Sequence, residues 1–495
     1  MSTSRTPVPP DEATTVIGAT GHSGTEEAAM AHHDPAVEAY KVPLSTAIWI
    51  VVANMIGTGV FTSLGFQLFF TEAPFVIMML WIVGGCIALC GAFAYAELAA
   101  ALPRSGGEFH FLSRIYHPAV GFVAGWLSVT VGFAVPIALS AMALSGYAMS
   151  AMGYVEAGKG TEAAGYVVLD SATFHAMDFR IGVTAVVGIA VAQLWSLRAT
   201  SIFQAVFTVA KLLIIVALIV AGLTITPAPQ PISFAPKAGD VWLIFSAGFA
   251  SSLYWVMYSY SGWNAATYII DEVKDPVRNL PRALLWGTVF VMALYVLLNM
   301  IFLYAAPVAA LKGVKNVASP AALHIFGASG AQIVSAIICF GLIATISATT
   351  WVGPRVSKAM GEQVAALSFF AKTSKGGIPW VAVLVQMFIT LAMLRLGEGN
   401  METILNYIQF TLTVSATLTV AGLFVLRLRE PDLPRPYRAW GYPITPLFFI
   451  ITSVYMMVVM LQNKPVESMA GFATLLSGLV VYYGSQIWQK KKGAV

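Results

Sequence analysis

Charged residues are scarce in this sequence: Asp, Glu, Lys and Arg make up 10% of its 495 residues, whereas 58% are hydrophobic. Soluble domains carry about a quarter charged residues, so most of this surface must face something other than water. Apolar runs of about 18 residues or more recur along the chain, and about 20 apolar residues span the hydrocarbon core of a bilayer. Backbone groups in lipid must be hydrogen-bonded within their own segment, so these runs predict an all-α integral membrane protein. The runs lack the alternation that a β-barrel needs.

Cysteine is equally rare, with Cys86, Cys90 and Cys339 all inside apolar runs. Cys86 and Cys90 share one helix face, which would suit a metal or redox pair. No second cluster of ligands lies near them, so small core residues are the favoured interpretation. Because no loop carries a cysteine, we expect no disulfide-linked accessory subunit. We also predict no cofactor, no metal, no nucleic-acid partner and no enzymatic activity, since no catalytic set appears at a useful spacing.

Residues 1–40 are rich in Ser, Thr, Ala, Pro and Gly and contain no apolar run, which predicts a disordered tail and excludes a signal peptide. Beyond the tail, the apolar pattern predicts twelve helices and therefore two termini on the same side. Their approximate bounds are 45–70, 74–101, 118–150, 180–197, 203–226, 241–270, 284–306, 330–360, 379–396, 402–428, 443–462 and 469–488.

Basic residues are distributed unevenly between the two sides of this arrangement. Most of the 27 Lys and Arg residues fall on the side of the N-terminus, including Arg278, Arg282, Arg435 and Arg438. Cytoplasmic loops carry such an excess of positive charge. We therefore expect a multi-pass protein with both termini in the cytoplasm, and the short loops favour a prokaryotic inner (plasma) membrane.

Lys211 is the one basic residue that lies inside the membrane, because all others fall on one side or the other, at the ends of the predicted spans or in the segments between them. A charged side chain near the membrane centre costs at least about 2.5 kcal/mol, so such a residue is a functional candidate. The alternative is that its long side chain reaches the cytoplasmic surface, roughly two helical turns away.

Two predicted helices contain polar, glycine-bearing interruptions. Ile56-Gly57-Thr58-Gly59 interrupts the first helix, and Tyr258 to Gly262 interrupts the sixth. Either one alone is compatible with close helix packing through small residues. Paired interruptions at corresponding positions of two halves indicate a transporter built from inverted repeats. Unwound backbone exposes N–H groups that suit a carboxylate and carbonyl groups that suit an ammonium, and an amino acid offers both.

Several motifs appear in the order typical of one superfamily. They are Ile56-Gly57-Thr58-Gly59-Val60-Phe61 and the stretches at 95–98, 103–108, 261–264, 271–276, 279–283 and 435–443. With these motifs the chain resembles the amino acid–polyamine–organocation superfamily, in particular its L-type amino acid transporter branch. The resemblance implies a LeuT-type fold with one repeat at 41–226, an inverted second repeat at 241–428, and two further helices at 443–488.

The resemblance also implies roles for residues in the two interruptions. The site would include Ile56 and Gly57, and the amides of Thr58 and Gly59 would bind the substrate carboxylate. Carbonyl groups would bind the substrate ammonium, namely those of Met55, Tyr258, Ser259 and Ser261. Tyr258 would also act as an aromatic gate over the substrate, and Lys211 would stand in place of a sodium ion between the first and eighth helices. Ser261 stands where relatives often have glycine.

These observations favour a secondary transporter of neutral amino acids that works by alternating access, as a sodium-independent exchanger or a proton symporter. No Asp or Glu falls deep within a predicted span to balance a cationic substrate. Transport of cationic amino acids or polyamines is the alternative in the same class. An amino-acid sensor that does not transport is the alternative from another class, and such a protein would usually carry a structured signalling extension.

Overall fold

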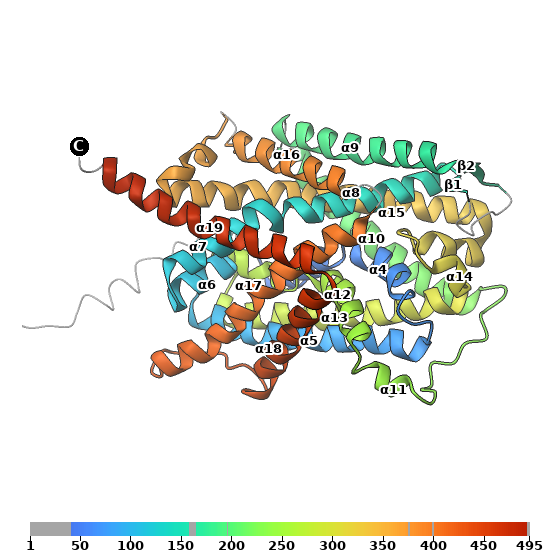
Figure 1. Cartoon of the computed structure of the whole chain (residues 1–495), viewed down its shortest axis with the longest axis horizontal. Helices are drawn as coiled ribbons and strands as arrows, with labels where there is room; N and C mark the ends of the chain where they lie inside the picture. Colours follow the sequence, from blue (N-terminus) through green and yellow to red (C-terminus); the bar gives the residue numbers. More distant parts are fainter. Residues whose placement is uncertain (1–40, 158–164, 196, 375–376, 398–399, 493–495) are drawn as a thin grey trace, which may run out of the picture. The chain divides into compact units, whose positions relative to one another are not determined.

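The computed structural model describes residues 41–157, 165–195, 197–374, 377–397 and 400–492. The tail expected at 1–40 lies outside these residues. The described chain is helical apart from loops and two short strands, β1 (Tyr154–Glu156) and β2 (Val167–Leu169), which pair in parallel. Figure 1 shows long helices running side by side.

The helices up to residue 224 form the first half of the chain. They are α3 (Leu44–Met55), α4 (Gly59–Gln67), α5 (Pro74–Ala101), α6 (Gly107–Ile115), α7 (Pro118–Leu127), the π-helical turn η1 (Ser128–Gly132), α8 (Ala134–Ala151), α9 (Ser171–Trp195) and α10 (Leu197–Thr224).

The second half and the C-terminal part contain the remaining helices. They are α11 (Asp240–Leu243), α12 (Ala247–Tyr260), the 3-10 helix η2 (Ala265–Glu272), α13 (Pro276–Ala305), α14 (Val308–Leu311), α15 (Ala318–Gln363), the 3-10 helix η3 (Ala365–Ala371), α16 (Trp380–Leu396), α17 (Met401–Arg429), α18 (Ile444–Asn463) and α19 (Pro465–Lys492).

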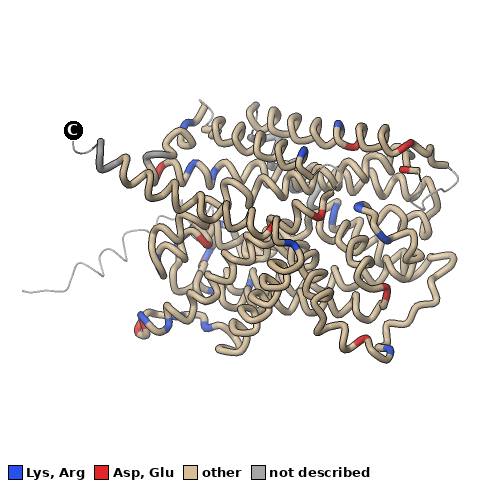
Figure 2. The backbone as a smooth tube through the Cα atoms, in the orientation of Figure 1, with Lys and Arg blue, Asp and Glu red and all other residues tan. Residues whose placement is uncertain are grey.

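Nine segments of the described chain are long and apolar enough to cross a membrane, and two shorter apolar helices lie at Val209–Thr224 and Trp380–Leu396. With the interrupted α12–η2 segment they account for the twelve helices expected from the sequence. Figure 2 shows long stretches of the backbone without a charged residue. This arrangement confirms an all-α membrane protein.

Several helices begin earlier than the apolar pattern predicts, among them α13 and α15. α13 starts at Pro276 rather than near residue 284, so the charged stretch forms its first turns, with Pro276 at the start of the helix. Proline suits that position because its fixed φ matches the helix and its missing N–H needs no acceptor. α15 starts at Ala318 rather than near residue 330, and it has a kink at Gly327, where φ is 74°.

Each helix of the first half has a counterpart in the second half, five predicted spans later along the chain. α12 is the counterpart of α3, α13 of α5, α15 of α8 and α17 of α10, and the packing partners of the two halves correspond in the same way. α3 packs on α13, and its counterpart α12 packs on α5; α10 packs on α15, and α17 packs on α8. Counterparts also pack on each other, as α5 does on α13 and α8 on α15. The division into repeats at 41–226 and 241–428 stays a prediction, which this reciprocal pairing supports.

Buried aromatic residues surround the two interruptions. Trp81 of α5 and Tyr295 of α13 are fully buried, with ring centroids 5.6 Å apart. Tyr260, at the end of α12, donates a hydrogen bond to the carbonyl oxygen of Trp81 at 2.9 Å. These contacts fix α5, α12 and α13 around the point where the helices break.

Candidate functional site

The first interruption separates α3, which ends at Met55, from α4, which begins at Gly59. The amides of Thr58, Gly59 and Val60 form no hydrogen bond with any part of the chain that the structure describes. Unpaired N–H groups at the start of a helix carry partial positive charge. This end of α4 can therefore bind an anion such as a carboxylate.

The second interruption lies between α12, which ends at Tyr260, and η2, which begins at Ala265. Gly262 has a φ of 93°, and a Cβ there would lie 2.8 Å from the carbonyl oxygen of Asn54. Glycine is therefore required where this segment passes α3. Within the described residues, the carbonyl oxygens of Ser259 and Ser261 accept no hydrogen bond and remain available to a donor such as an ammonium.

The two interruptions lie against each other. The hydroxyl oxygens of Thr58 and Tyr258 are 3.1 Å apart, and those of Ser63 and Ser259 are 2.8 Å apart. A Cβ on Gly59 would lie 2.4 Å from the Cα of Ser259, so α4 and α12 approach as closely as their backbones allow. The polar stretches predicted from the sequence thus lie against each other in the structure.

The two glycines of the first interruption have different surroundings. Gly59 is enclosed by Ser259, whereas a Cβ on Gly57 would find its nearest protein atoms 4.0 Å away. Close packing therefore explains the glycine at position 59. It does not explain the glycine at position 57, where a Cβ would make only ordinary van der Waals contacts.

Lys211 reaches the first interruption from α10. Its ammonium donates hydrogen bonds to the carbonyl oxygen of Ile56 at 2.8 Å and to the hydroxyl of Thr345 in α15 at 3.0 Å. The side chain is 3% exposed. Gly341 leaves room for it, since a Cβ there would lie 2.3 Å from Lys211 Cγ. This geometry excludes a side chain that extends to the membrane surface, and it places the lysine between the first and eighth helices.

Two of the carbonyl groups expected to bind an ammonium already have donors. The oxygen of Met55 accepts hydrogen bonds from the Tyr295 hydroxyl at 2.6 Å and from the Gly57 amide at 2.8 Å. The oxygen of Tyr258 accepts the Ser261 amide at 3.0 Å. Ser259 and Ser261 remain the better candidates. Sequence reasoning missed Tyr295, which looks like any other aromatic residue of an apolar helix.

A buried ion pair lies near the C-terminal end of α5. The carboxylate of Glu97 is fully buried and accepts two hydrogen bonds from Arg427, at 2.8 and 2.6 Å. It also accepts the amide of Ala439 at 2.6 Å, and Arg435 lies 3.6 Å away. The cluster joins α5 to the end of α17 and to the segment that follows it.

Glu108 in α6 forms a second cluster at the same end of α5. It accepts hydrogen bonds from the hydroxyls of Tyr95, at 2.6 Å, and of Ser415, and Asn264 donates to it at 3.3 Å. Burial raises the pKa of Glu108, and the bonds from Ser415 and Tyr95 oppose that rise. α5, α6, α17 and the segment after α12 therefore meet at one carboxyl group.

Comparison with known proteins shows which family this chain resembles. A family model described as amino acid permease matches residues 43–484. The human large neutral amino acids transporter small subunit 2 is 26% identical over 474 residues, which cover 91% of this chain and 81% of that protein. The human b(0,+)-type amino acid transporter 1 is 26% identical over 89% of this chain and 86% of its own. The serine/threonine exchanger SteT of Bacillus subtilis is 25% identical over 90% of this chain and 96% of its own.

Proposed function

The chain belongs to the amino acid permease family, and we propose that it carries neutral amino acids across the membrane by alternating access, without sodium. The observation that carries this proposal is the position of Lys211. Its ammonium bridges Ile56 and Thr345, between the two helices that would otherwise share a sodium ion in the superfamily the sequence resembles. A fixed cation there removes the need for an external one.

The substrate would bind with its charged groups on the two interrupted helices. Its carboxylate would meet the unpaired amides of Thr58 and Gly59, and its ammonium would meet the carbonyl oxygens of Ser259 and Ser261. The Tyr258 ring would cover the site, since its hydroxyl lies beside Thr58. Half-helices that meet at a site can tilt separately, which suits a protein that opens to one side at a time.

A neutral substrate side chain fits the chemistry around the site. No carboxylate is among the described side chains that are hydrogen-bonded to residues 55–63 or 258–261. A cationic side chain would be buried there without a counter-charge, which is unfavourable. The relatives named for large neutral amino acids and for serine and threonine support the same preference.

We propose the plasma membrane as the location, with both termini in the cytoplasm, because basic residues concentrate in the loops on the N-terminal side. Cys86 and Cys90 lie in α5 and Cys339 lies in α15, so all three cysteines fall within membrane helices. We therefore propose that no accessory subunit is attached through a disulfide. The family and its relatives are named for transport, and we propose no catalytic activity.

Uptake into proteoliposomes tests the proposal. The purified chain should take up labelled leucine or serine with equal rates in sodium and choline buffers, and unlabelled leucine or serine should compete. Stronger competition by arginine or putrescine would replace the neutral substrate with a cationic one. Binding of leucine or serine without any uptake would favour a sensor. Loading the vesicles with unlabelled substrate separates exchange, which it accelerates, from proton symport, which a pH gradient drives.

A further inference from the structure

A cavity of about 250 Å³ lies away from the two interruptions themselves. It is lined by the end of α4, by α8, α9 and the start of α17, and by the loop 312–317 together with the start of α15. Phe66 of α4 lines it, and seven residues of helix separate Phe66 from Gly59, which is about 10 Å at 1.5 Å per residue. The cavity and the site at Thr58 and Gly59 are therefore different places on the same helix.

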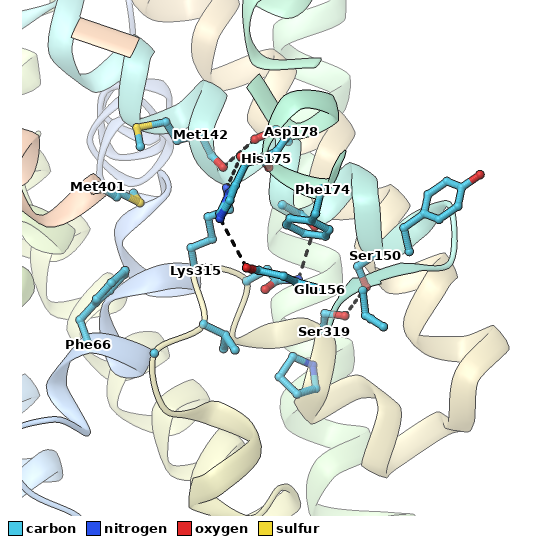
Figure 3. A pocket seen from close by; sticks show the side chains of 18 of the residues that line it. Phe66, Met142, Ser150, Glu156, Phe174, His175, Asp178, Lys315, Ser319 and Met401 are labelled. Carbon is cyan, nitrogen blue, oxygen red and sulfur yellow. Dashed lines mark hydrogen bonds and ion pairs between the residues drawn. The ribbon is translucent and has the colours of Figure 1, made fainter. Parts of the chain in front are cut away.

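One wall of the cavity carries paired charges. Lys315 of the loop contacts Asp178 of α9 at 2.5 Å, and the Nε2 atom of His175 lies 3.4 Å from a carboxylate oxygen of Glu156. The apolar side chains Phe66, Met142 and Met401 also line the cavity. Figure 3 shows these two groups on opposite sides, with Lys315 extending between them. A ligand with a charged head and an apolar tail fits such a division.

We propose that this cavity is a second binding site for an amino acid with an apolar side chain. The carboxylate of the amino acid would pair with Lys315, and its ammonium would pair with Asp178. Inserting a zwitterion in this way replaces one ion pair with two. Asp178 favours the exchange because its Oδ1 atom is buried and has no hydrogen-bond partner among the described residues, and a buried acceptor without a donor is unfavourable.

The size of the cavity suits this ligand. At ~30 Å³ for each water molecule, about 250 Å³ corresponds to roughly eight waters. An engineered apolar cavity of ~150 Å³ holds benzene, so the larger volume here accommodates leucine, with its nine heavy atoms. Leucine would place its side chain against Phe66, Met142 and Met401.

The wall formed by the loop is firmly held, and it is held by α4. The amide of Gly313 donates to the carbonyl oxygen of Gly65 at 2.8 Å, and the amide of Val317 donates to that of Phe61 at 3.0 Å. The stem of Lys315 lies on Gly146 of α8, where a Cβ would be 2.9 Å from Lys315 Cε. The lysine is thus positioned by backbone contacts, and the cavity is connected to the helix that begins at the first interruption.

This inference takes its ligand from the proposed function, so the test must separate the two. We would measure the number of labelled leucine molecules bound per chain by equilibrium dialysis of the purified full-length protein. Two leucines should bind to the unsubstituted chain, and one to Lys315→Met, which keeps the length of the side chain and removes its charge. Lys315→Arg should bind two, which shows that the loss follows the charge.

Lys312→Met is the matched control, because Lys312 lies on the same loop and pairs with Glu72 at 2.7 Å outside the cavity. It should bind two leucines. One leucine on the unsubstituted chain, or two on Lys315→Met, would overturn the second site and leave the proposed function standing. If the unsubstituted chain binds neither leucine nor serine, the proposed function fails together with this inference.

Discussion

The ammonium nitrogen of Lys211 lies 2.8 Å from the carbonyl oxygen of Ile56, at the point where the first membrane helix is interrupted. This contact ties α10 to the broken backbone, and the bond from Lys211 to Thr345 extends the tie to α15 at 3.0 Å. A movement of the end of α3 relative to α10 or α15 must therefore lengthen or break these bonds. The lysine that we propose as the substitute for an ion is in this way coupled to the interruption where we propose that the substrate binds.

Removing the charge of Lys211 should abolish most transport. Hydrogen bonds to a charged group contribute about 1.5–3 kcal/mol, and each 1.4 kcal/mol is a factor of ten. Lys211→Met should therefore lower leucine or serine uptake about 10- to 100-fold at equal amounts of reconstituted protein. Lys358→Met is the control, since Lys358 forms a partly exposed pair with Glu362 at 3.4 Å. It should stay within about twofold, because such pairs contribute little. Undiminished uptake by Lys211→Met would remove the lysine from the mechanism.

The two glycines of the first interruption should respond differently to alanine. Gly59→Ala places a Cβ 2.4 Å from the Cα of Ser259, and overpacking of this kind costs about 1–3 kcal/mol, so the thermal midpoint should fall. A Cβ in Gly57→Ala would lie no closer than 4.0 Å to the described protein atoms, so the midpoint should stay unchanged. Its uptake should nevertheless fall if the substrate lies against Gly57. A stable Gly57→Ala protein with full uptake would place the substrate elsewhere.

Much of the candidate site could be predicted because polar residues and glycines within an apolar run mark the positions where a membrane helix is interrupted. The polar stretches at Ile56–Gly59 and Tyr258–Gly262 stand out against apolar surroundings, and Lys211 stands out as a lone charge. All three come together in the structure. The pattern also places the twelve helices, since a membrane leaves the backbone little choice but to form them.

Contacts between distant segments could not be predicted in this way. Glu97 and Arg427 are 330 residues apart, and Glu108 and Ser415 are 307 apart. Each looks like a loop or helix-end residue on its own, and only the folded chain shows which partner it meets. Tyr295 donates a hydrogen bond from its hydroxyl to the carbonyl oxygen of Met55. Nothing in the sequence around Tyr295 distinguishes it from other aromatic residues of an apolar helix. The start of α13 was missed because charged residues in its first turns resemble a loop.

The ion pair of Glu97 should be important for stability. Removing one partner of a buried pair costs about 3–5 kcal/mol, because the other charge is left buried and unpaired. Glu97→Gln leaves Arg427 without its carboxylate and should lower the thermal midpoint strongly. The control is Glu430→Gln, which breaks a more exposed pair with Arg114 at 2.7 Å. That pair should be worth about 0–1 kcal/mol. Equal losses in the two variants would contradict the assignment of Glu97 as a structural anchor.

Glu108 should give the protein a pH-dependent stability. It lies in α6, between two membrane spans, and burial raises its pKa above the ordinary 4.5. The folded chain therefore holds this proton more tightly than the unfolded chain does. The resulting stabilisation is present in full below pH 4.5 and is lost as the pH rises through the raised pKa.

Glu108→Gln isolates this effect because glutamine keeps the neutral form at every pH. The thermal midpoint of Glu108→Gln minus that of the unsubstituted protein should increase from pH 4.5 upward and become constant above the raised pKa. Ser415→Ala removes a hydrogen bond that lowers the pKa of Glu108, so the loss should move to higher pH in that variant. A difference that does not change with pH, or that decreases as the pH rises, would show that the carboxyl group is ionised at least as readily in the folded chain as in the unfolded one.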